Sequence, residues 1–254
     1  MEIIIKNDYS DMSTEAARII GDQIKRKPNT VLGLATGSTP LGLYNELIKL
    51  NNSGDIDFSN VITYNLDEYI GLTQKHPQSY KYFMYDKLFS HINIKDENIH
   101  LPNGEHFDDK VCELYEDSIK NNGGIDIQIL GIGRTGHIAF NEPTSSLRSR
   151  TRIKTLTPQT INDNSRFFNN SSEVPIYAIT MGVGTIMEAK KIILMASGKA
   201  KAKPIKNAVE GPISSMCSAS AIQMHQEAMV IIDEAAASKL SEKEYYKWVY
   251  KNKI

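Results

Sequence analysis

The sequence has few cysteines, no long hydrophobic run and no excess of charge of either sign. Its only cysteines, Cys112 and Cys217, lie far apart, without a neighbouring Cys-x-x-Cys or Cys/His group. This spacing argues against a disulfide framework, a redox motif or a metal site, so we expect both to be small buried apolar residues and expect no metal.

The charge balance and the hydrophobic pattern exclude two further classes of partner. The 29 Lys and Arg residues nearly cancel the 30 Asp and Glu residues among 254. Such a chain lacks the positive field that nucleic-acid binding requires. No uninterrupted stretch of about 20 apolar residues is present to span a membrane, and the apolar run after Met1 is too short for a secretory signal. We therefore expect a cytoplasmic protein with no nucleic-acid and no membrane partner.

Short apolar runs alternate with helical periodicity along the chain. The runs are continuous, which is typical of strands buried on both faces of a parallel sheet. Strands are predicted at residues 31–35, 61–65, 125–130, 176–180, 192–196 and 229–232. Helices are predicted at 12–24, with Ser13 or Thr14 as N-cap, and at 41–50, whereas the polar segment 162–173 resembles a loop. The pattern predicts an α/β fold, a doubly wound, mostly parallel sheet with helices on both faces (Rossmann-like), in a single domain of residues 1–254.

In such sheets the ligand binds at the carboxyl ends of the strands, so the residues that follow each strand are considered together. After the first strand, Gly37 permits a tight turn, Thr39 can cap the next helix and Pro40 suits its first turn. Free N–H groups and the hydroxyls of Thr36, Ser38 and Thr39 would then form a phosphate cradle. A nucleotide P-loop is not expected, because its Gly-Lys-Ser/Thr is missing. A capped turn without a ligand is the alternative.

Acidic and basic side chains follow the other strands. Asp67 and Glu68 come after the second strand, where either could be a general base or, alternatively, a helix N-cap. Lys201 follows the strand at 192–196, and Arg166 lies in the polar segment. Both basic residues fit anion capture, although solvated surface charges would look the same.

The third strand is followed by a G-x-G-x-x-G pattern at residues 131–136. Pro143 would interrupt the long helix of a dinucleotide site, so we do not expect a nicotinamide cofactor. The segment supplies His137 and Glu142 instead, and we interpret His137 as a proton carrier oriented by Glu142. A phosphate cradle, a carboxylate base and a His/Glu pair together favour proton transfer beside a carbonyl, as in sugar-phosphate isomerisation.

Four segments, at residues 34–40, 65–69, 136–143 and 149–156, resemble the glucosamine-6-phosphate deaminase family, and the similarity runs from about Ile4 to about Leu240. The resemblance implies isomerisation with deamination, in which glucosamine 6-phosphate and water give fructose 6-phosphate and ammonia without a metal or organic cofactor. It implies that His137, assisted by Glu142, opens the sugar ring and that Asp67 moves a proton from C2 to C1. The phosphate would be held by Thr36, Gly37, Ser38, Thr39, Arg166 and Lys201.

The resemblance also implies an assembly and an activator. Many members of the family are hexamers activated by N-acetylglucosamine 6-phosphate bound between subunits. The residues that match the effector motif are Ser145, Arg152, Lys154 and Thr155. We therefore expect a homo-oligomer with this activator, the alternative being that Arg152 and Lys154 merely alternate on an exposed strand.

Three departures from the family pattern bear on these expectations. Thr135 stands where the family has an acid or amide, and because a hydroxyl carries no negative charge, the support for a protonated His137 should weaken. Pro204 could delay a helix after Lys201, and Cys217 replaces a frequent Trp, which would alter subunit contacts. The alternative functions are a 6-phosphogluconolactonase, a galactosamine-6-phosphate isomerase or a catalytically weakened sugar-phosphate-binding regulator.

Overall fold

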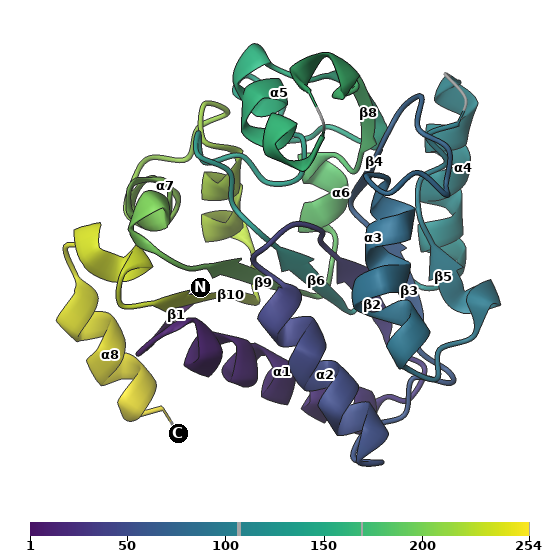
Figure 1. The fold of residues 1–254 in the computed structure, drawn as a ribbon. Helices are drawn as coiled ribbons and strands as arrows, with labels where there is room; N and C mark the ends of the chain where they lie inside the picture. Colours follow the sequence, from purple (N-terminus) through teal and green to yellow (C-terminus); the bar gives the residue numbers. More distant parts are fainter. Residues whose placement is uncertain (106–107, 169, 254) are drawn as a thin grey trace.

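The computed structural model describes residues 1–105, 108–168 and 170–253. Its frame is a seven-stranded sheet in the order β1-β10-β9-β6-β2-β3-β5, with every neighbouring pair parallel (Figure 1). The strands are β1 (Glu2–Lys6), β2 (Val31–Leu34), β3 (Ile62–Asn65), β5 (Ile99–His100), β6 (Ile127–Leu130), β9 (Lys191–Ala196) and β10 (Ala228–Asp233). Those in the centre are buried on both faces, which explains their continuous apolar runs.

Helices cover both faces of this sheet. One apolar cluster joins the sheet to α1 (Tyr9–Arg26), α2 (Leu41–Asn52) and α3 (Tyr80–Lys87). The other joins it to α4 (Asp109–Asn121), α6 (Val183–Met187) and α7 (Ala202–Val209), while α8 (Lys243–Lys251) lies beside β1. The predicted single-domain, doubly wound α/β fold is therefore confirmed. None of the helices in the described ranges is long and apolar enough to cross a membrane.

One predicted strand belongs to a different sheet. The segment at 176–180 forms β8 (Tyr177–Thr180), which lies between β4 (Asp67–Tyr69) and β7 (Arg152–Thr155) in a small antiparallel sheet. Its placement in the parallel sheet was wrong, because an apolar run identifies a strand but not the strand it pairs with. The correction matters for function, since Asp67 is part of this small sheet.

The predicted helix boundaries also need correction. Asp8 caps α1 by accepting the N–H of Asp11, so neither Ser13 nor Thr14 is its N-cap. Pro40 is the N-cap residue of α2 and no side chain caps that helix, so Thr39 does not. Residues 162–173 are not one loop, since they include the end of α5 (Pro158–Asn164) and the 3-10 turns Ser165–Phe167 and Ser171–Glu173.

Pro204 does not delay the helix that follows Lys201. A 3-10 turn, Lys199–Lys201, leads directly into α7, and Pro204 is the third residue of that helix. A proline in the first turn is tolerated because its missing N–H has no partner within the helix there.

The direction in which the chain crosses the sheet changes between β2 and β6. From β2 the chain continues outward to β3 and β5, whereas from β6 it continues to β9 and β10 on the other side. Ligands of open α/β sheets bind at the carboxyl ends of strands where the order reverses. The small sheet is attached at this edge, because the Leu66 N–H donates to the Leu34 carbonyl (3.1 Å) and the Met181 N–H donates to the Leu66 carbonyl (2.7 Å).

Candidate active site

The structure gives Asp67 and Glu68 different roles. Glu68 accepts backbone N–H groups from Tyr69, Tyr80 and Lys81, each at 2.9 Å, and so caps the start of α3. Asp67 is buried at the beginning of β4, and burial, followed by the negative charge of Glu68, raises the pKa of Asp67 to about 8. A carboxyl group that ionises near neutral pH is suited to accept and return a proton. Asp67 therefore remains the candidate base, and Glu68 has the structural role.

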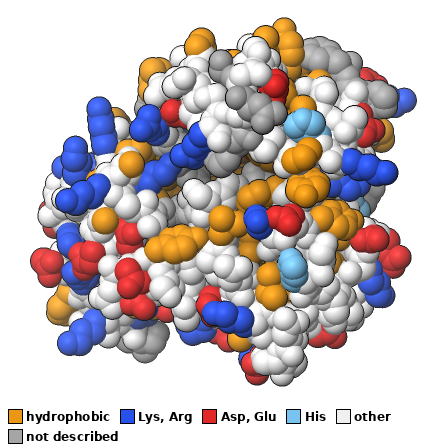
Figure 2. Space-filling view, viewed as in Figure 1, with side chains coloured by type: hydrophobic (Ala, Val, Ile, Leu, Met, Phe, Trp, Pro, Cys, Tyr) orange, Lys and Arg blue, Asp and Glu red, His pale blue; other side chains and the backbone are white. Residues whose placement is uncertain are grey.

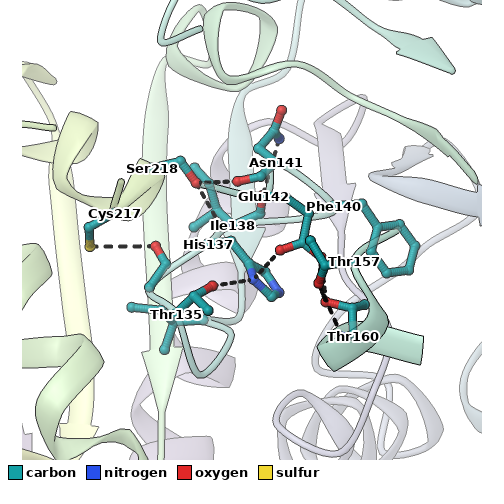
Figure 3. A network of polar contacts seen from close by, with 12 residues as sticks. Thr135, His137, Ile138, Phe140, Asn141, Glu142, Thr157, Thr160, Cys217 and Ser218 are labelled. Carbon is teal, nitrogen blue, oxygen red and sulfur yellow. Dashed lines mark hydrogen bonds and ion pairs between the residues drawn. The ribbon is translucent and has the colours of Figure 1, made fainter. Parts of the chain in front are cut away.

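Two side chains surround one nitrogen of His137. The hydroxyl of Thr135 lies 2.8 Å from Nδ1, and Oε2 of Glu142 lies 3.4 Å from the same nitrogen (Figure 3). On the other side, a Cβ added to Gly133 would lie 2.1 Å from Nε2, so the imidazole rests against the bare backbone of that glycine. With Nδ1 occupied by Thr135 and Glu142, Nε2 is the nitrogen left to exchange a proton with a ligand.

Hydrogen bonds from distant segments of the chain stabilise the turn that carries these residues. Ala139 adopts a positive φ of 48°, which is costly for a residue with a side chain. The Ser218 hydroxyl accepts the N–H of Ile138 (3.2 Å) and donates to the carbonyl of Asn141 (2.9 Å), so it closes the turn (Figure 3). The Asn141 amide donates to the Met181 carbonyl at 2.9 Å. Sequence reasoning missed Ser218, because nothing in its spacing connects it with residues so far away in the chain.

The small sheet joins the candidate base to the His137 turn. Asp67 lies opposite Thr180 in the register of β4 and β8. The Thr180 hydroxyl accepts the N–H of Phe140 at 3.1 Å, and Phe140 lies between His137 and Glu142. Asp67 and the His137 turn are thus both paired with Thr180 of β8, which brings the candidate base and the candidate proton carrier to one edge of the fold.

The predicted phosphate ligands border the same edge. Lys201 donates to the carbonyl of Ile132, in the loop after β6, at 2.6 Å. Burial, and then the positive charges of Arg166 and Arg134, lower the pKa of Lys201. This cluster of cations would be stabilised by an anion. Lys and Arg side chains also gather over α7 on the face shown in Figure 2.

The turn at 36–39 begins at the carboxyl end of β2, next to β6. Gly37 has a φ of +90°, so the tight turn requires a glycine there. The Tyr9 hydroxyl lies 3.1 Å from the carbonyl oxygens of Ser38 and Thr39 and accepts the Gly42 N–H at 2.7 Å. Tyr9, which sequence reasoning missed, therefore holds the carbonyl groups of the turn against the start of α2.

The residues of the predicted effector motif lie beside the His137 turn. Arg152 is half-buried in β7 and donates to Oδ1 of Asn141 at 2.9 Å, and Lys154 and Thr155 follow it on the same strand. Ser145 is buried, and its hydroxyl has no hydrogen-bond partner among the described residues. Arg152 is therefore more than one of two alternating charges on an exposed strand. In the described ranges, no group of three or more His, Cys, Asp or Glu side chains is placed to hold a metal ion.

Residues 8–231 match the family described as glucosamine-6-phosphate isomerases and 6-phosphogluconolactonases. A glucosamine-6-phosphate deaminase of Thermoanaerobacter sp. (strain X514) is 55% identical over 245 residues, which is 96% of this chain and 97% of that protein. The glucosamine-6-phosphate deaminase of Shewanella loihica is 53% identical over 250 residues, covering 98% of this chain and 93% of the relative.

Solved structures agree with the observed fold. A monomeric glucosamine-6-phosphate deaminase superposes with a TM-score of 0.92 at 45% identity, covering 94% of this chain and all of the other. The 6-phosphogluconolactonase of Leishmania guyanensis superposes with a TM-score of 0.72 at 21% identity, over 93% of this chain and 97% of the other, which shows a shared fold alone.

Proposed function

This chain belongs to the family of glucosamine-6-phosphate isomerases and 6-phosphogluconolactonases, and we propose that it converts glucosamine 6-phosphate and water to fructose 6-phosphate and ammonia. The observation that carries the proposal is the buried carboxyl of Asp67, whose pKa is raised to about 8 and which lies opposite Thr180 of β8, the residue that also holds the His137 turn. The relatives that are more than half identical over nearly their full length are deaminases of this substrate.

The reaction begins with opening of the sugar ring. His137 takes the proton of the C1 hydroxyl and delivers a proton to the ring oxygen, so the bond between C1 and that oxygen breaks and an aldehyde forms. Glu142 and Thr135, both at Nδ1, stabilise the charge that His137 carries in between. Thr135 supplies a hydrogen-bonding hydroxyl for this step, although it cannot contribute the negative charge of an acid.

Asp67 then moves a proton along the open chain. It removes the proton of C2, which gives an enolamine, and returns a proton to C1, which gives an imine at C2. Water adds to the imine, and ammonia leaves as the ketose forms. Because the pKa of Asp67 lies near 8, the carboxyl can both accept and release a proton near neutral pH.

The phosphate group of the substrate takes no part in the bond changes, but its binding contributes energy throughout the reaction. We assign Thr36, Gly37, Ser38 and Thr39 to one side of the phosphate and Arg166 and Lys201 to the other. The positive charge of Arg166, which after burial contributes to lowering the pKa of Lys201, supports this assignment. Anchoring the dianion orients C1 and C2 against Asp67, which lowers the entropic cost of the proton transfer.

The alternative activities make different demands on the site. Hydrolysis of 6-phosphogluconolactone removes no proton from C2, so it does not require a buried base such as Asp67 at that carbon. Galactosamine 6-phosphate differs from the proposed substrate only at C4. A weakened regulator would bind the sugar phosphate without turnover, and the hydrogen bond between Thr135 and His137 argues against that loss.

Ammonia release by the purified protein tests the proposal. We expect release from glucosamine 6-phosphate, much less from galactosamine 6-phosphate, and no hydrolysis of 6-phosphogluconolactone. Preferred turnover of either competing substrate would replace the proposed reaction. Tight binding of glucosamine 6-phosphate without ammonia would identify a regulator.

A finer part of the proposal concerns regulation. We propose that N-acetylglucosamine 6-phosphate activates a homo-oligomer by binding at Ser145, Arg152, Lys154 and Thr155 between subunits. The bond from Arg152 to Asn141 supports it, because that contact connects the effector residues to the neighbour of Glu142. We further propose that the protein acts in the cytoplasm, since a phosphorylated substrate does not cross a bilayer unaided.

A further inference from the structure

The two oxygens of the Glu142 carboxylate have different surroundings. Oε1 accepts hydrogen bonds from two hydroxyls, those of Thr160 and Thr157, the second at 3.1 Å (Figure 3). Oε2 is buried, has no hydrogen-bond partner among the described residues and lies 3.4 Å from Nδ1 of His137. One oxygen is therefore held in place while the other is left for the imidazole.

Both hydroxyls come from the first turn of α5. Thr157 is the N-cap of this helix, and its oxygen accepts the N–H of Thr160 at 3.2 Å. The two hydroxyl oxygens are themselves 3.1 Å apart, so the proton of Thr157 can be given either to Thr160 or to Glu142. Thr160, in contrast, donates its proton to the carboxylate, and both Thr160 and Glu142 are buried. Thr160 is thus the donor dedicated to Glu142.

The same helix is attached to two other parts of the site. The amide of Asn164 donates to the hydroxyl of Tyr69, two residues beyond Asp67, at 2.8 Å. Asp163 forms an ion pair with Arg134, next to Thr135, at 3.3 Å. Because these two contacts hold the C-terminal end of α5, the position of Thr160 is set by the helix as well as by its bond to Glu142.

We propose that Thr160 is a positioning residue for the ring-opening pair. Its hydroxyl, carried on α5, fixes the rotation of the Glu142 carboxylate so that Oε2 faces Nδ1 of His137, and it keeps that carboxylate ionised. This inference rests on the proposed function, in which His137 and Glu142 open the sugar ring. In this proposal α5 positions the Glu142 carboxylate, in addition to leading the chain to Arg166.

The surroundings of Glu142 agree with this role. Burial by itself would raise the pKa of Glu142, but the close contact with His137 and its charge, together with the hydrogen bonds from Thr160 and Thr157, lower it to about 2. The guanidinium of Arg152, on β7, donates to Oδ1 of Asn141, the residue before Glu142. The hydroxyls of α5 are therefore among the main groups that keep the carboxylate negative beside the imidazole.

Three variants test the inference in the whole chain. Thr160→Val keeps the shape of the side chain but removes the hydroxyl, and Thr160→Ser restores it. The matched control is Thr63→Val, because the Thr63 hydroxyl is buried and has no partner among the described residues. We expect Thr160→Val to lower kcat for ammonia release by about 10-fold to 100-fold, the usual effect of losing a hydrogen bond to a charged group. Thr160→Ser should recover most of the rate, and Thr63→Val should match the wild type.

Binding of an open-chain sugar-alcohol phosphate separates positioning from affinity. This analogue needs no ring opening, so Thr160→Val should bind it within about twofold of the wild type in calorimetry. Equal losses of kcat and of analogue binding would overturn the proposal, because they would show general damage to the site. Thr160→Ala is the second variant should valine disturb the first turn of α5.

A titration of Glu142 gives a readout that does not depend on activity. The carboxyl carbon, followed by NMR in protein labelled at glutamate, should show a higher pKa in Thr160→Val than in the wild type or Thr63→Val. An unchanged titration with an unchanged kcat would overturn the role of Thr160. If the wild type releases no ammonia but the titration shifts as expected, the proposed function fails while the contact between Thr160 and Glu142 is upheld.

Discussion

At the scale of single residues, the ionised form of the proposed catalytic base lowers the stability of the fold. Asp67 is buried beside Glu68, and the protein holds it where its ionised form is unfavourable. Its pKa of about 8 exceeds its usual 3.8, so the folded state binds its proton more tightly than the unfolded chain does. The folded state is therefore most favoured when Asp67 is protonated. This contribution to stability is complete below pH 3.8 and is lost as the pH rises through 8. The reactive form of the base is therefore the form that costs stability.

Replacing Asp67 with asparagine should separate these two effects. Asp67→Asn should abolish exchange of the C2 proton and leave the affinity for an open-chain sugar-alcohol phosphate nearly unchanged. The Tm of the variant should exceed that of the wild type by an amount that grows between about pH 4 and pH 8. The difference should be about 2–4 °C for each kcal/mol gained in the free energy of unfolding. In the wild type, kcat/KM should increase with pH up to about 8, since only the ionised base reacts. Retained exchange in the variant would remove Asp67 from the mechanism.

Gly133 makes room for the imidazole. A methyl group there would lie 2.1 Å from Nε2 of His137, and the ring can move only by leaving Thr135 and Glu142. Gly133→Ala should therefore lower kcat by at least about 10-fold, with a change of Tm of only a few degrees, because the clash is with the end of a side chain. Gly131→Ala is the matched control, since a Cβ at Gly131 meets nothing within 4 Å. Equal activity in the two variants would contradict this prediction.

The sequence was informative about the types of the site residues but not about their pairing. Asp67 and Glu68 are adjacent carboxylates, and only the approach of the α3 amides to Glu68 distinguishes the base from the cap. His137 and Glu142 are near in the chain, so their contact was predictable. Thr160 was not, because its bond to Glu142 depends on where α5 begins.

At the scale of secondary-structure elements, the catalytic turn depends on a segment distant in the sequence. The 3-10 helix Ser218–Met224 places the Ser218 hydroxyl between Ile138 and Asn141, across the positive φ of Ala139. A buried hydroxyl that both accepts and donates costs about 1–3 kcal/mol to remove. The strained turn would then be free to relax away from its catalytic geometry.

Ser218→Ala should consequently lower both stability and activity. The Tm should fall by about 2–4 °C per kcal/mol, and kcat should fall by about 10-fold as the His137 turn relaxes. Ser220→Ala is the control on the same 3-10 helix, because the Ser220 hydroxyl bonds Ser214 and not the catalytic turn. It should lose comparable stability and little activity. Ser218→Thr should restore both properties, and a failure to restore kcat would count against the positioning role.

The central strands of the main sheet follow from local patterns more readily than those of the small sheet do. The strands β2, β6 and β9 are buried on both faces and continuous in hydrophobicity, so their class was predictable, whereas the edge strands β1 and β5 were missed. β4 has only three residues, two of them acidic, and no propensity marks it as a strand. It forms because the chain leaving β3 pairs with β8, a contact between residues more than a hundred positions apart.

At the scale of the whole molecule, family membership leaves the state of assembly open. One relative of known structure, 45% identical, is a monomer. Large apolar side chains are exposed on this chain beside Cys217, where Met216 is 59% exposed, and on α8, where Trp248 is 65% exposed. Met and Trp are enriched at protein–protein interfaces relative to the rest of the surface.

The proposed activation requires those contacts, because the effector residues would be completed by a second subunit. We therefore expect sedimentation at micromolar concentration to show a homo-oligomer, and sigmoidal dependence of the rate on glucosamine 6-phosphate. Saturating N-acetylglucosamine 6-phosphate should make the curve hyperbolic, since it binds the active state more tightly than the inactive one. By reciprocity, substrate should raise the affinity for the activator by the same factor. A monomer with hyperbolic kinetics, unaffected by the activator, would show that Arg152 serves only to hold Asn141 beside the catalytic pair.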